Sequence, residues 1–307
     1  MSDLKFDGRV AIVTGAGAGL GKTYALDLAK RGAKVVVNDL GGARDGSGSS
    51  SSAADTVVDE IKAAGGEATA NYDSVATIEG GENIVKTAID AYGKVDILIN
   101  NAGILRDKSI LKMSEEEWEI VLAVHLKGTY SCSRAVFANM KANNYGRIIN
   151  TTSGAGLYGN FGQTNYSAAK MGIVGLMNSV HTEGAKYNIK VNTIAPVAAS
   201  RLTEDVMPPE MFEKLKPEFV TPLVVNLAHE DLQESCMIFN CGLGWYSRAA
   251  IVCAPGVVLG DGERLVSAEE VQAEWKTISG LEEAKPLGSV NDTFGFIMTG
   301  LQGLQKQ

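Results

Sequence analysis

Apolar residues along the first two thirds of the chain follow two alternating patterns. Short continuous apolar runs, such as VAIVT at 10–14 and KVVVND at 34–39, predict buried strands. Between such runs, apolar residues recur at helical spacing, as in 20–31 and 78–92. Buried strands that alternate with helices are typical of a parallel sheet covered on both faces. The pattern therefore predicts an α/β fold built on a doubly wound, Rossmann-type parallel sheet.

The same alternation continues to about residue 196, where the pattern loosens before a last predicted core strand. Ser114 and Glu117 have the spacing of a capping box, which predicts that a long helix begins there. A Gly/Ser-rich stretch, GGARDGSGSSSSAA at 41–54, interrupts the alternation and is expected to be a mobile surface loop. The remaining predicted strands of the sheet are 67–73, 96–100, 146–152, 190–195 and 237–241.

Beyond Gly244 lies a C-terminal segment of about sixty residues. A strand interrupted by Pro255-Gly256 is expected at 249–258, and Ser267 with Glu270 has the spacing of a second capping box. Because no linker separates this part from the core, we expect a single domain over 1–307. In it, a core of 1–244 carries a C-terminal extension of 245–307.

Composition narrows the classes of function. The chain has 307 residues, is 45% hydrophobic and has a net charge of −8, which argues against nucleic acid as the main partner. The four cysteines lack metal or redox spacing and the three histidines are scattered, so no metal site is expected. No apolar run is long enough to span a membrane, and neither end of the chain resembles a targeting signal.

A glycine cluster between the first strand and the first helix indicates a site for a dinucleotide. In TGAGAGLG at 14–21, the backbone at Gly15, Gly19, Leu20 and Gly21 could approach a pyrophosphate at the helix N-terminus. Such a cluster could equally form an ordinary tight turn. The flanking strand and helix favour the dinucleotide.

Asp39 and Asp73 end two predicted strands, 34–39 and 67–73, at the same edge of the expected sheet. Asp39 is placed to accept hydrogen bonds from the ribose hydroxyls, which favours NAD over NADP; the alternative is a solvated carboxylate. Asp73 could meet the adenine amino group, or it could be a helix N-cap.

Ser153, Tyr166 and Lys170 form the candidate catalytic set. Tyr166 and Lys170 are four residues apart, so a helix places both on one face, with the lysine beside the phenol. A cation there is expected to lower the tyrosine pKa from about 10 and make the phenol a usable base. Ser153, thirteen residues upstream, could hydrogen-bond the same substrate oxygen. The three groups suit proton transfer to or from an alcohol or ketone during hydride transfer.

These motifs together resemble the short-chain dehydrogenase/reductase family. The resemblance rests on TGAGAGLG at 14–21, NNAG at 100–103, Ser153 and YSAAK at 166–170. Longer strings resemble the (3R)-hydroxyacyl-CoA dehydrogenase units of peroxisomal multifunctional enzymes, and the segment after Gly244 does so too. These strings are VVVNDLGG at 36–42, VHLKG at 124–128, YGNFGQTNYSAAK at 158–170 and NTIAP at 192–196.

The resemblance implies roles for individual residues. Tyr166 would be the general base, Lys170 would also bind the nicotinamide ribose, and Ser153 would orient the substrate oxygen. His125 occupies the position of a proton-relay asparagine, where it could relay a proton or simply satisfy a buried backbone group. The remaining implied cofactor contacts are Asn101, Ala102 and Gly103 on the adenosine side, Pro196, followed here by Val197 instead of glycine, and Thr203 at the carboxamide.

The resemblance also implies the reaction and its setting. It implies NAD-dependent oxidation of a (3R)-3-hydroxyacyl-CoA to the 3-ketoacyl-CoA in peroxisomal β-oxidation. It further implies a homodimer formed through the helix that carries Met171, and hydratase or sterol-carrier domains as partners. Arg106, Lys108 and Lys112 could meet the phosphates of the acyl-CoA, or could simply be solvated. Two enzymatic alternatives stay open, a 3-oxoacyl carrier-protein reductase and a hydroxysteroid dehydrogenase, as does a non-catalytic nucleotide-sensing domain.

Overall fold

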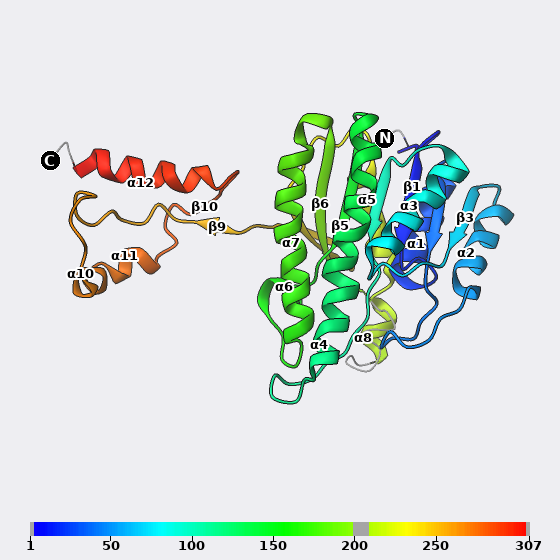
Figure 1. Cartoon of the computed structure of the whole chain (residues 1–307), viewed down its shortest axis with the longest axis horizontal. Helices are drawn as coiled ribbons and strands as arrows, with labels where there is room; N and C mark the ends of the chain where they lie inside the picture. Colours follow the sequence, from blue (N-terminus) through cyan, green and yellow to red (C-terminus); the bar gives the residue numbers. More distant parts are fainter. Residues whose placement is uncertain (1–2, 199–208, 305–307) are drawn as a thin grey trace. The chain divides into compact units, whose positions relative to one another are not determined.

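An eight-stranded sheet forms the centre of the fold in the computed structural model, which describes residues 3–198 and 209–304 (Figure 1). Its strands are β1 (Val10–Thr14), β2 (Lys34–Asn38), β3 (Glu67–Asn71), β4 (Ile97–Asn100), β5 (Gly146–Thr151), β6 (Ile189–Pro196), β7 (Ile238–Gly242) and β8 (Trp245–Ala249). Their order is β3-β2-β1-β4-β5-β6-β7-β8, and β1 to β7 pair in parallel. The predicted fold class, a doubly wound parallel sheet, is confirmed.

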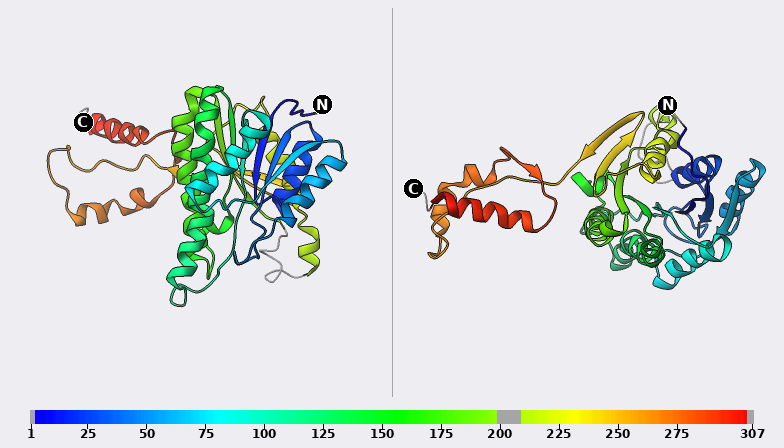
Figure 2. Two further views of the ribbon diagram at one scale, coloured as in Figure 1. Left: turned by 45° about the vertical axis from the view of Figure 1, so that its right-hand side comes forward. Right: turned by 90° about the horizontal axis from the view of Figure 1, so that it is seen from above.

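Helices cover both faces of this sheet (Figure 2). The helical elements are α1 (Gly19–Lys30), α2 (Ser52–Ala63), α3 (Ile78–Tyr92), α4 (Glu115–Leu122), η1 (Ala123–Lys127), α5 (Gly128–Ala142), α6 (Gly154–Tyr158), α7 (Thr164–Gly184), η2 (Ala185–Tyr187), α8 (Pro209–Lys214), η4 (Pro217–Phe219) and α9 (Thr221–Ala228). Helix α5 packs between α3 and α7, whereas α1 packs against α2 and α9. The two layers bury the continuous apolar strands that the sequence pattern predicts.

The carboxyl ends of the strands share one edge of the sheet. The order reverses between β1 and β4, so the connections after these two strands leave in opposite directions. In open parallel sheets this switch point opens a crevice that binds ligands. Thr14, Asn38 and Asn100, which end β1, β2 and β4, therefore lie at the position where a site is expected.

The chain forms two compact units, residues 1–248 and 249–307. The second unit contains α10 (Ala268–Ala273), α11 (Trp275–Ser279), α12 (Asn291–Leu304) and an antiparallel pair, β9 (Val252–Cys253) with β10 (Lys285–Pro286). The unit boundary falls close to the predicted end of the core at residue 244. That the whole chain forms a single domain stays a prediction.

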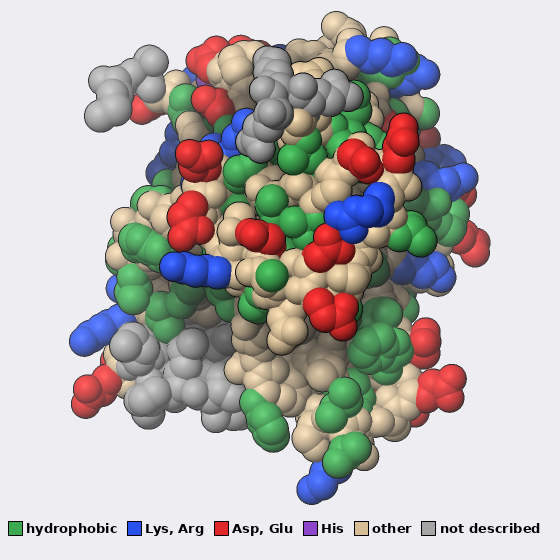
Figure 3. Space-filling view, turned by 90° about the vertical axis from the view of Figure 1, so that its left-hand side faces the viewer, with side chains coloured by type: hydrophobic (Ala, Val, Ile, Leu, Met, Phe, Trp, Pro, Cys, Tyr) green, Lys and Arg blue, Asp and Glu red, His purple; other side chains and the backbone are tan. Residues whose placement is uncertain are grey.

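The second unit lacks a core of its own. None of the residues described between 249 and 304 is buried. The strand predicted over 249–258 is confirmed in part: Ala249 ends β8 and Val252–Cys253 forms β9, whereas 254–258 is not strand. The predicted interruption at Pro255-Gly256 is present, and Gly256 has a φ of +65°. The capping box of Ser267 and Glu270 is confirmed at the start of α10. Acidic, basic and apolar side chains are interspersed on the face of the molecule that Figure 3 shows.

Candidate active site

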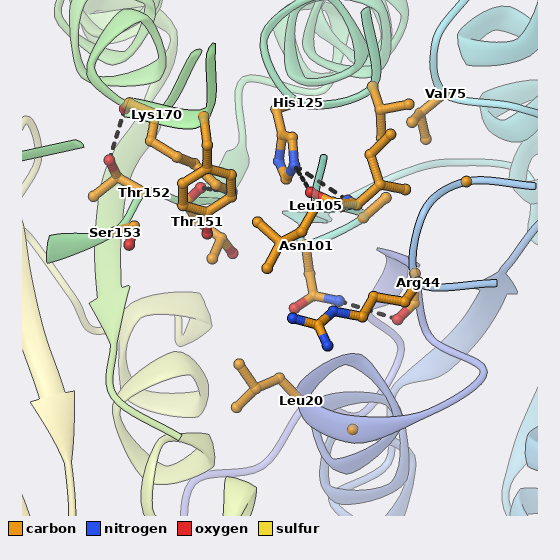
Figure 4. A pocket seen from close by; sticks show the side chains of 18 of the residues that line it. Leu20, Arg44, Val75, Asn101, Leu105, His125, Thr151, Thr152, Ser153 and Lys170 are labelled. Carbon is orange, nitrogen blue, oxygen red and sulfur yellow. Dashed lines mark hydrogen bonds between the residues drawn. The ribbon is translucent and has the colours of Figure 1, made fainter. Parts of the chain in front are cut away.

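A cavity of about 670 Å³ opens at the carboxyl edge of the sheet. Its walls come from the turn after β1, the ends of β2 to β6, the start of α6 and one face of α7 (Figure 4). Segments far apart in the sequence thus meet in one pocket, because parallel strands end on the same side. Of the predicted site residues, the cavity is lined by Gly15, Gly19, Leu20, Asp39, Asp73, Asn101, Ala102, Gly103, His125, Ser153, Tyr166, Lys170 and Pro196.

In the glycine turn at 14–21, backbone atoms pack closely against each other and against the backbone of Ala102. A Cβ on Gly15 would lie 2.7 Å from Ala102 Cα, and one on Gly21 would lie 2.2 Å from the carbonyl oxygen of Gly15. Gly21 is buried behind the turn and, unlike Gly15 and Gly19, does not line the cavity. Ala18, the N-cap of α1, offers no side-chain cap, so N–H groups of the first turn stay available to an anion.

The Asn101–Gly103 segment holds this turn in place. Asn101 Nδ2 donates to the carbonyl oxygens of Thr14 and Gly15, each at 3.0 Å. The backbone N–H groups of Asn101 and Ala102 donate to Thr14 Oγ1 at 3.0 and 3.1 Å. The side chain of Asn101 thus stabilises the glycine turn. Its contact with a cofactor stays a prediction, and the observed bonds indicate an indirect role through the conformation of that turn.

Asp39 lies where the sequence places a ribose ligand. Its Oδ2 accepts from Gly17 N at 2.8 Å and its Oδ1 from Gly41 N at 2.7 Å. Only 9% of Asp39 is exposed, which is unlike a solvated carboxylate. Each oxygen keeps a lone pair that can accept from a ribose hydroxyl.

Asp73 is also fixed within the cavity wall. Its carboxylate accepts from Asn71 Nδ2 at 2.8 Å and from Asn83 Nδ2 at 3.1 Å. The alternative role as an N-cap is wrong, since Thr77 caps α3 by accepting from Gly80 N. The contact of Asp73 with adenine stays a prediction.

Ser153, Tyr166 and Lys170 meet at one end of the cavity. Ser153 follows β5, caps α6 by accepting from Ala155 N, and hydrogen-bonds Tyr166. Lys170 lies one turn below Tyr166 on α7, its Nζ 5.4 Å from the centre of the phenol ring. That Nζ donates to the carbonyl oxygen of Thr151 at 2.8 Å. The three groups predicted to act together are therefore brought together.

The ionisation of Tyr166 differs from the expectation. Burial raises the pKa of the Tyr166 phenol to about 12, although the hydrogen bond with Ser153 acts in the opposite direction. Burial also lowers the pKa of Lys170 to about 7, so the lysine is only partly charged near neutral pH. The depression of the Tyr166 pKa that was expected from the lysine is thus outweighed by burial, which disfavours both charges; the role of Lys170 stays a prediction.

Lys170 gives a stability prediction with a definite sign. Above pH 7 the folded lysine is neutral, while in the unfolded chain it stays charged to about pH 10.5. The unfolded state then binds more protons, so the free energy of unfolding should rise with pH, by up to about 1.4 kcal/mol per unit. Lys170→Met should lack this contribution between pH 7 and 9. Denaturant unfolding at several pH values measures it, and equal slopes in both proteins would refute it.

His125 lies in a π-helical turn that interrupts the predicted long helix. The capping box of Ser114 and Glu117 is confirmed, but α4 passes into η1 at Ala123 before α5 continues. A π-helical turn inserts an extra residue and often marks a functional position. It places His125 at the cavity wall, with its ring 5.1 Å from the ring of Tyr166 in an edge-to-face contact.

Of the two roles expected for His125, its polar contacts favour the pairing of a buried backbone group over proton relay. Its Nε2 lies 3.1 Å from Ile104 N and 2.8 Å from Ile104 O. Burial, and then the charge of Lys170, hold the pKa of His125 well below its usual value, so the ring is neutral. Its Nδ1 has no hydrogen-bond partner among the described residues. Satisfying Ile104 is thus observed, and proton relay through Nδ1 stays a prediction.

The segment after β6 is only partly described. Pro196 ends β6, and both Pro196 and Val197 line the cavity. Thr203 lies outside the described residues. In the described ranges no group of three or more acidic, histidine or cysteine side chains could hold a metal ion.

The loop between β2 and α2 is a part of the site that the sequence did not predict. Residues 41–54 were expected to be a mobile surface loop, whereas α2 begins at Ser52 and Gly42, Ala43, Arg44 and Gly46 line the cavity. Arg106 secures this loop, its Nε donating to the carbonyl oxygen of Asp45 at 2.7 Å. Arg44, a charged residue within a run of glycine and serine, was the sequence feature that could have indicated a binding role for this loop.

No helix within the described residues is long and apolar enough to cross a membrane.

Comparison with known proteins identifies relatives over nearly the whole chain. A family model described as short chain dehydrogenase matches residues 9–207. Peroxisomal multifunctional enzyme A of Dictyostelium discoideum is 53% identical over 298 residues, which cover 97% of this chain and 66% of that protein.

Two solved structures share the fold. Full-length peroxisomal multifunctional enzyme type 2 from Drosophila melanogaster matches with a TM-score of 0.83 and 43% identity, covering 98% of this chain and 51% of that one. A 7α-hydroxysteroid dehydrogenase complexed with NADH and 7-oxo glycochenodeoxycholic acid matches with a TM-score of 0.71 and 30% identity, covering 80% of this chain and 98% of that one. This chain thus spans about half to two thirds of the length of these two multifunctional relatives.

Proposed function

The chain belongs to the short-chain dehydrogenase family, and we propose that it oxidises (3R)-3-hydroxyacyl-CoA to 3-ketoacyl-CoA with NAD in peroxisomal β-oxidation. One observation carries the proposal: a single cavity contains the Ser153–Tyr166–Lys170 set, the glycine turn and Asp39. The names of the relatives support the peroxisomal setting.

The residues present fit a nicotinamide dinucleotide. The uncapped first turn of α1 suits a pyrophosphate, and Asp39 can accept from the adenosine ribose. Its negative charge would repel a 2′-phosphate, which favours NAD. When bound, the nicotinamide supplies the hydride acceptor.

The chain's own groups handle the proton. Ser153 and Tyr166 bracket the position of the substrate oxygen, the serine orienting it and the phenol accepting its proton. Because burial holds the pKa of Tyr166 at about 12, the phenolate needs a positive charge nearby. Lys170, on the same face of α7, provides this charge when its ammonium is protonated. Proton release should then run past Lys170 Nζ, which lies against the carbonyl oxygen of Thr151.

The homodimer also remains a proposal. Three apolar side chains on α7, Ile173, Val174 and Met177, are buried within the chain itself. Met171, at 38% exposed, is left for a second copy. Hydratase or sterol-carrier domains are proposed as partners, because the relatives extend well beyond the matched part. Size-exclusion chromatography with light scattering would measure the dimer, and a monomer would refute it.

Replacing Asp39 should change cofactor choice. Asp39→Ala removes the acceptor for the ribose hydroxyls together with the charge that repels a 2′-phosphate. The preference for NAD over NADP, as a ratio of kcat/KM, should fall by about tenfold or more. Asp59→Ala, an exposed carboxylate on α2 outside the cavity lining, is the matched control. An unchanged ratio in the Asp39 variant would contradict the ribose role.

The reaction itself is tested with a panel of substrates. Matched (3R)- and (3S)-3-hydroxyacyl-CoA of several chain lengths, a hydroxyacyl carrier protein and a hydroxysteroid are each incubated with NAD, and NADH is followed. We expect NADH from the (3R)-acyl-CoA substrates. Faster turnover of the carrier-protein substrate would favour a 3-oxoacyl carrier-protein reductase, and faster turnover of the steroid would favour a hydroxysteroid dehydrogenase; either result would refute the proposal. Binding of NAD without any turnover would support a nucleotide-sensing domain.

A further inference from the structure

Arg44 places a cation in the cavity from the loop between β2 and α2. The loop leaves the sheet after Asp39, and Figure 4 shows the Arg44 side chain extending from it into the pocket. The cavity wall there includes Leu20, in the first turn of α1, and Asn101, which holds the glycine turn. A guanidinium thus enters the pocket from the side that faces the glycine turn.

The loop that carries Arg44 is folded and docked. Within it, Ala43 N donates to Ser47 O at 2.7 Å and Gly46 N donates to Ala43 O at 3.0 Å, which closes a tight turn around Arg44. Gly46 adopts a φ of +84°, and a Cβ at that position would lie 3.2 Å from Ile104 Cδ1. The glycines therefore build a specific turn that approaches Ile104 closely.

The docking fixes the backbone at Arg44 itself. The carbonyl oxygen of Arg44 accepts from Leu105 N at 3.1 Å, and that of the next residue, Asp45, accepts from Arg106 Nε at 2.7 Å. Asp39 secures the start of the loop through Gly41 N. A side chain whose backbone is held at both neighbours loses less conformational freedom when it binds a ligand.

We propose that Arg44 is a cofactor ligand that binds the dinucleotide pyrophosphate from the side opposite the glycine turn, so that residues 41–51 form a strap across it. The proposal rests on the proposed use of a dinucleotide. A guanidinium donates in a fork that matches two phosphate oxygens, which an ammonium does not. The glycine turn supplies backbone N–H groups on one side, and Arg44 supplies charge on the other.

A different phosphate would give the same arginine a different role. An arginine near the end of the second strand can bind the 2′-phosphate of NADP. Asp39 argues against that here, because its carboxylate is fixed at the ribose position by Gly17 N and Gly41 N. If Arg44 binds the pyrophosphate, its replacement weakens ADP-ribose; if it binds the 2′-phosphate, only 2′-phospho-ADP-ribose is weakened.

The test measures binding of cofactor fragments to the full chain without any acyl substrate. The dissociation constants of adenosine, ADP-ribose and 2′-phospho-ADP-ribose are compared for the wild type, Arg44→Gln and Arg44→Lys. Arg44→Gln should weaken ADP-ribose about tenfold and leave adenosine within twofold. Arg44→Lys should lie between, because it keeps the charge and loses the fork. Arg134→Gln, an exposed arginine paired with Glu82 outside the cavity, is the matched control.

The outcomes separate this inference from the function on which it rests. If the wild type binds ADP-ribose and Arg44→Gln binds it equally well, the pyrophosphate role is refuted. A loss confined to 2′-phospho-ADP-ribose also refutes it and assigns Arg44 to the 2′-phosphate. An equal loss for adenosine would show a disturbed pocket and refute it as well. If the wild type binds none of these ligands, the proposed dinucleotide function itself fails.

Discussion

Tyr166→Phe should lower kcat for hydroxyacyl oxidation by about 10²- to 10⁴-fold and leave the affinity for NAD nearly unchanged. The variant removes one oxygen, the group proposed to accept the substrate proton. The ring remains, and with it the edge-to-face contact with His125 at 5.1 Å. Loss of the hydroxyl also removes the hydrogen bond with Ser153, so the substrate oxygen loses one of its two proposed partners.

The control for this variant is Tyr158→Phe. Tyr158 is 72% exposed and lies outside the cavity lining, although it ends α6 close to the site. Its variant should keep wild-type turnover. Steady-state NADH formation gives kcat, and calorimetry gives the affinity for NAD. Retained turnover in Tyr166→Phe would remove the tyrosine from the mechanism.

Gly21→Ala should weaken NAD binding at least tenfold and lower the free energy of unfolding by about 1–3 kcal/mol. A Cβ there would lie 2.2 Å from the carbonyl oxygen of Gly15 and 2.6 Å from Asn101 Nδ2. The nearest atom belongs to the backbone of the glycine turn, so the turn has to shift. The shift would break the hydrogen bonds by which Asn101 holds the turn.

Gly295→Ala is the control for the glycine variant. Gly295 lies within α12, where an added Cβ meets nothing within 4 Å. Alanine favours a helix over glycine by about 1 kcal/mol, so this variant should be neutral or slightly stabilising. NAD titration and denaturant unfolding measure both proteins. Wild-type NAD affinity in Gly21→Ala would show that close packing at this position is not required.

The sheet and much of the site were predictable because they depend on local patterns. Apolar runs such as 10–14 identify strands in any parallel sheet, and the carboxyl ends of those strands then converge on one edge. The spacing of Tyr166 and Lys170 on one helix fixes their separation independently of the rest of the chain. Capping boxes at Ser114 and Ser267 are local for the same reason.

What could not be predicted depends on tertiary contacts. The loop at 41–51 has the composition of a flexible segment, yet its backbone bonds to Leu105 and Arg106, far along the chain, give it one conformation. The π-helical turn at His125 was not predicted either, and the ring of His125 contacts the backbone of Ile104, which comes from another part of the chain. Burial decides the pKa values of Tyr166 and Lys170, and no spacing rule reports burial.

The central claim is that this cavity transfers hydride from the carbinol carbon of a (3R)-3-hydroxyacyl-CoA to NAD. The most direct measurement uses (3R)-3-hydroxyacyl-CoA that carries deuterium at carbon 3, with mass spectrometry of the cofactor product. We predict one deuterium in NADH, labelled NADH formed at least about 10²-fold more slowly when Tyr166→Phe replaces the wild type, and no labelling from the matched (3S) substrate. NADH without deuterium, or equal labelling from both stereoisomers, would contradict the account.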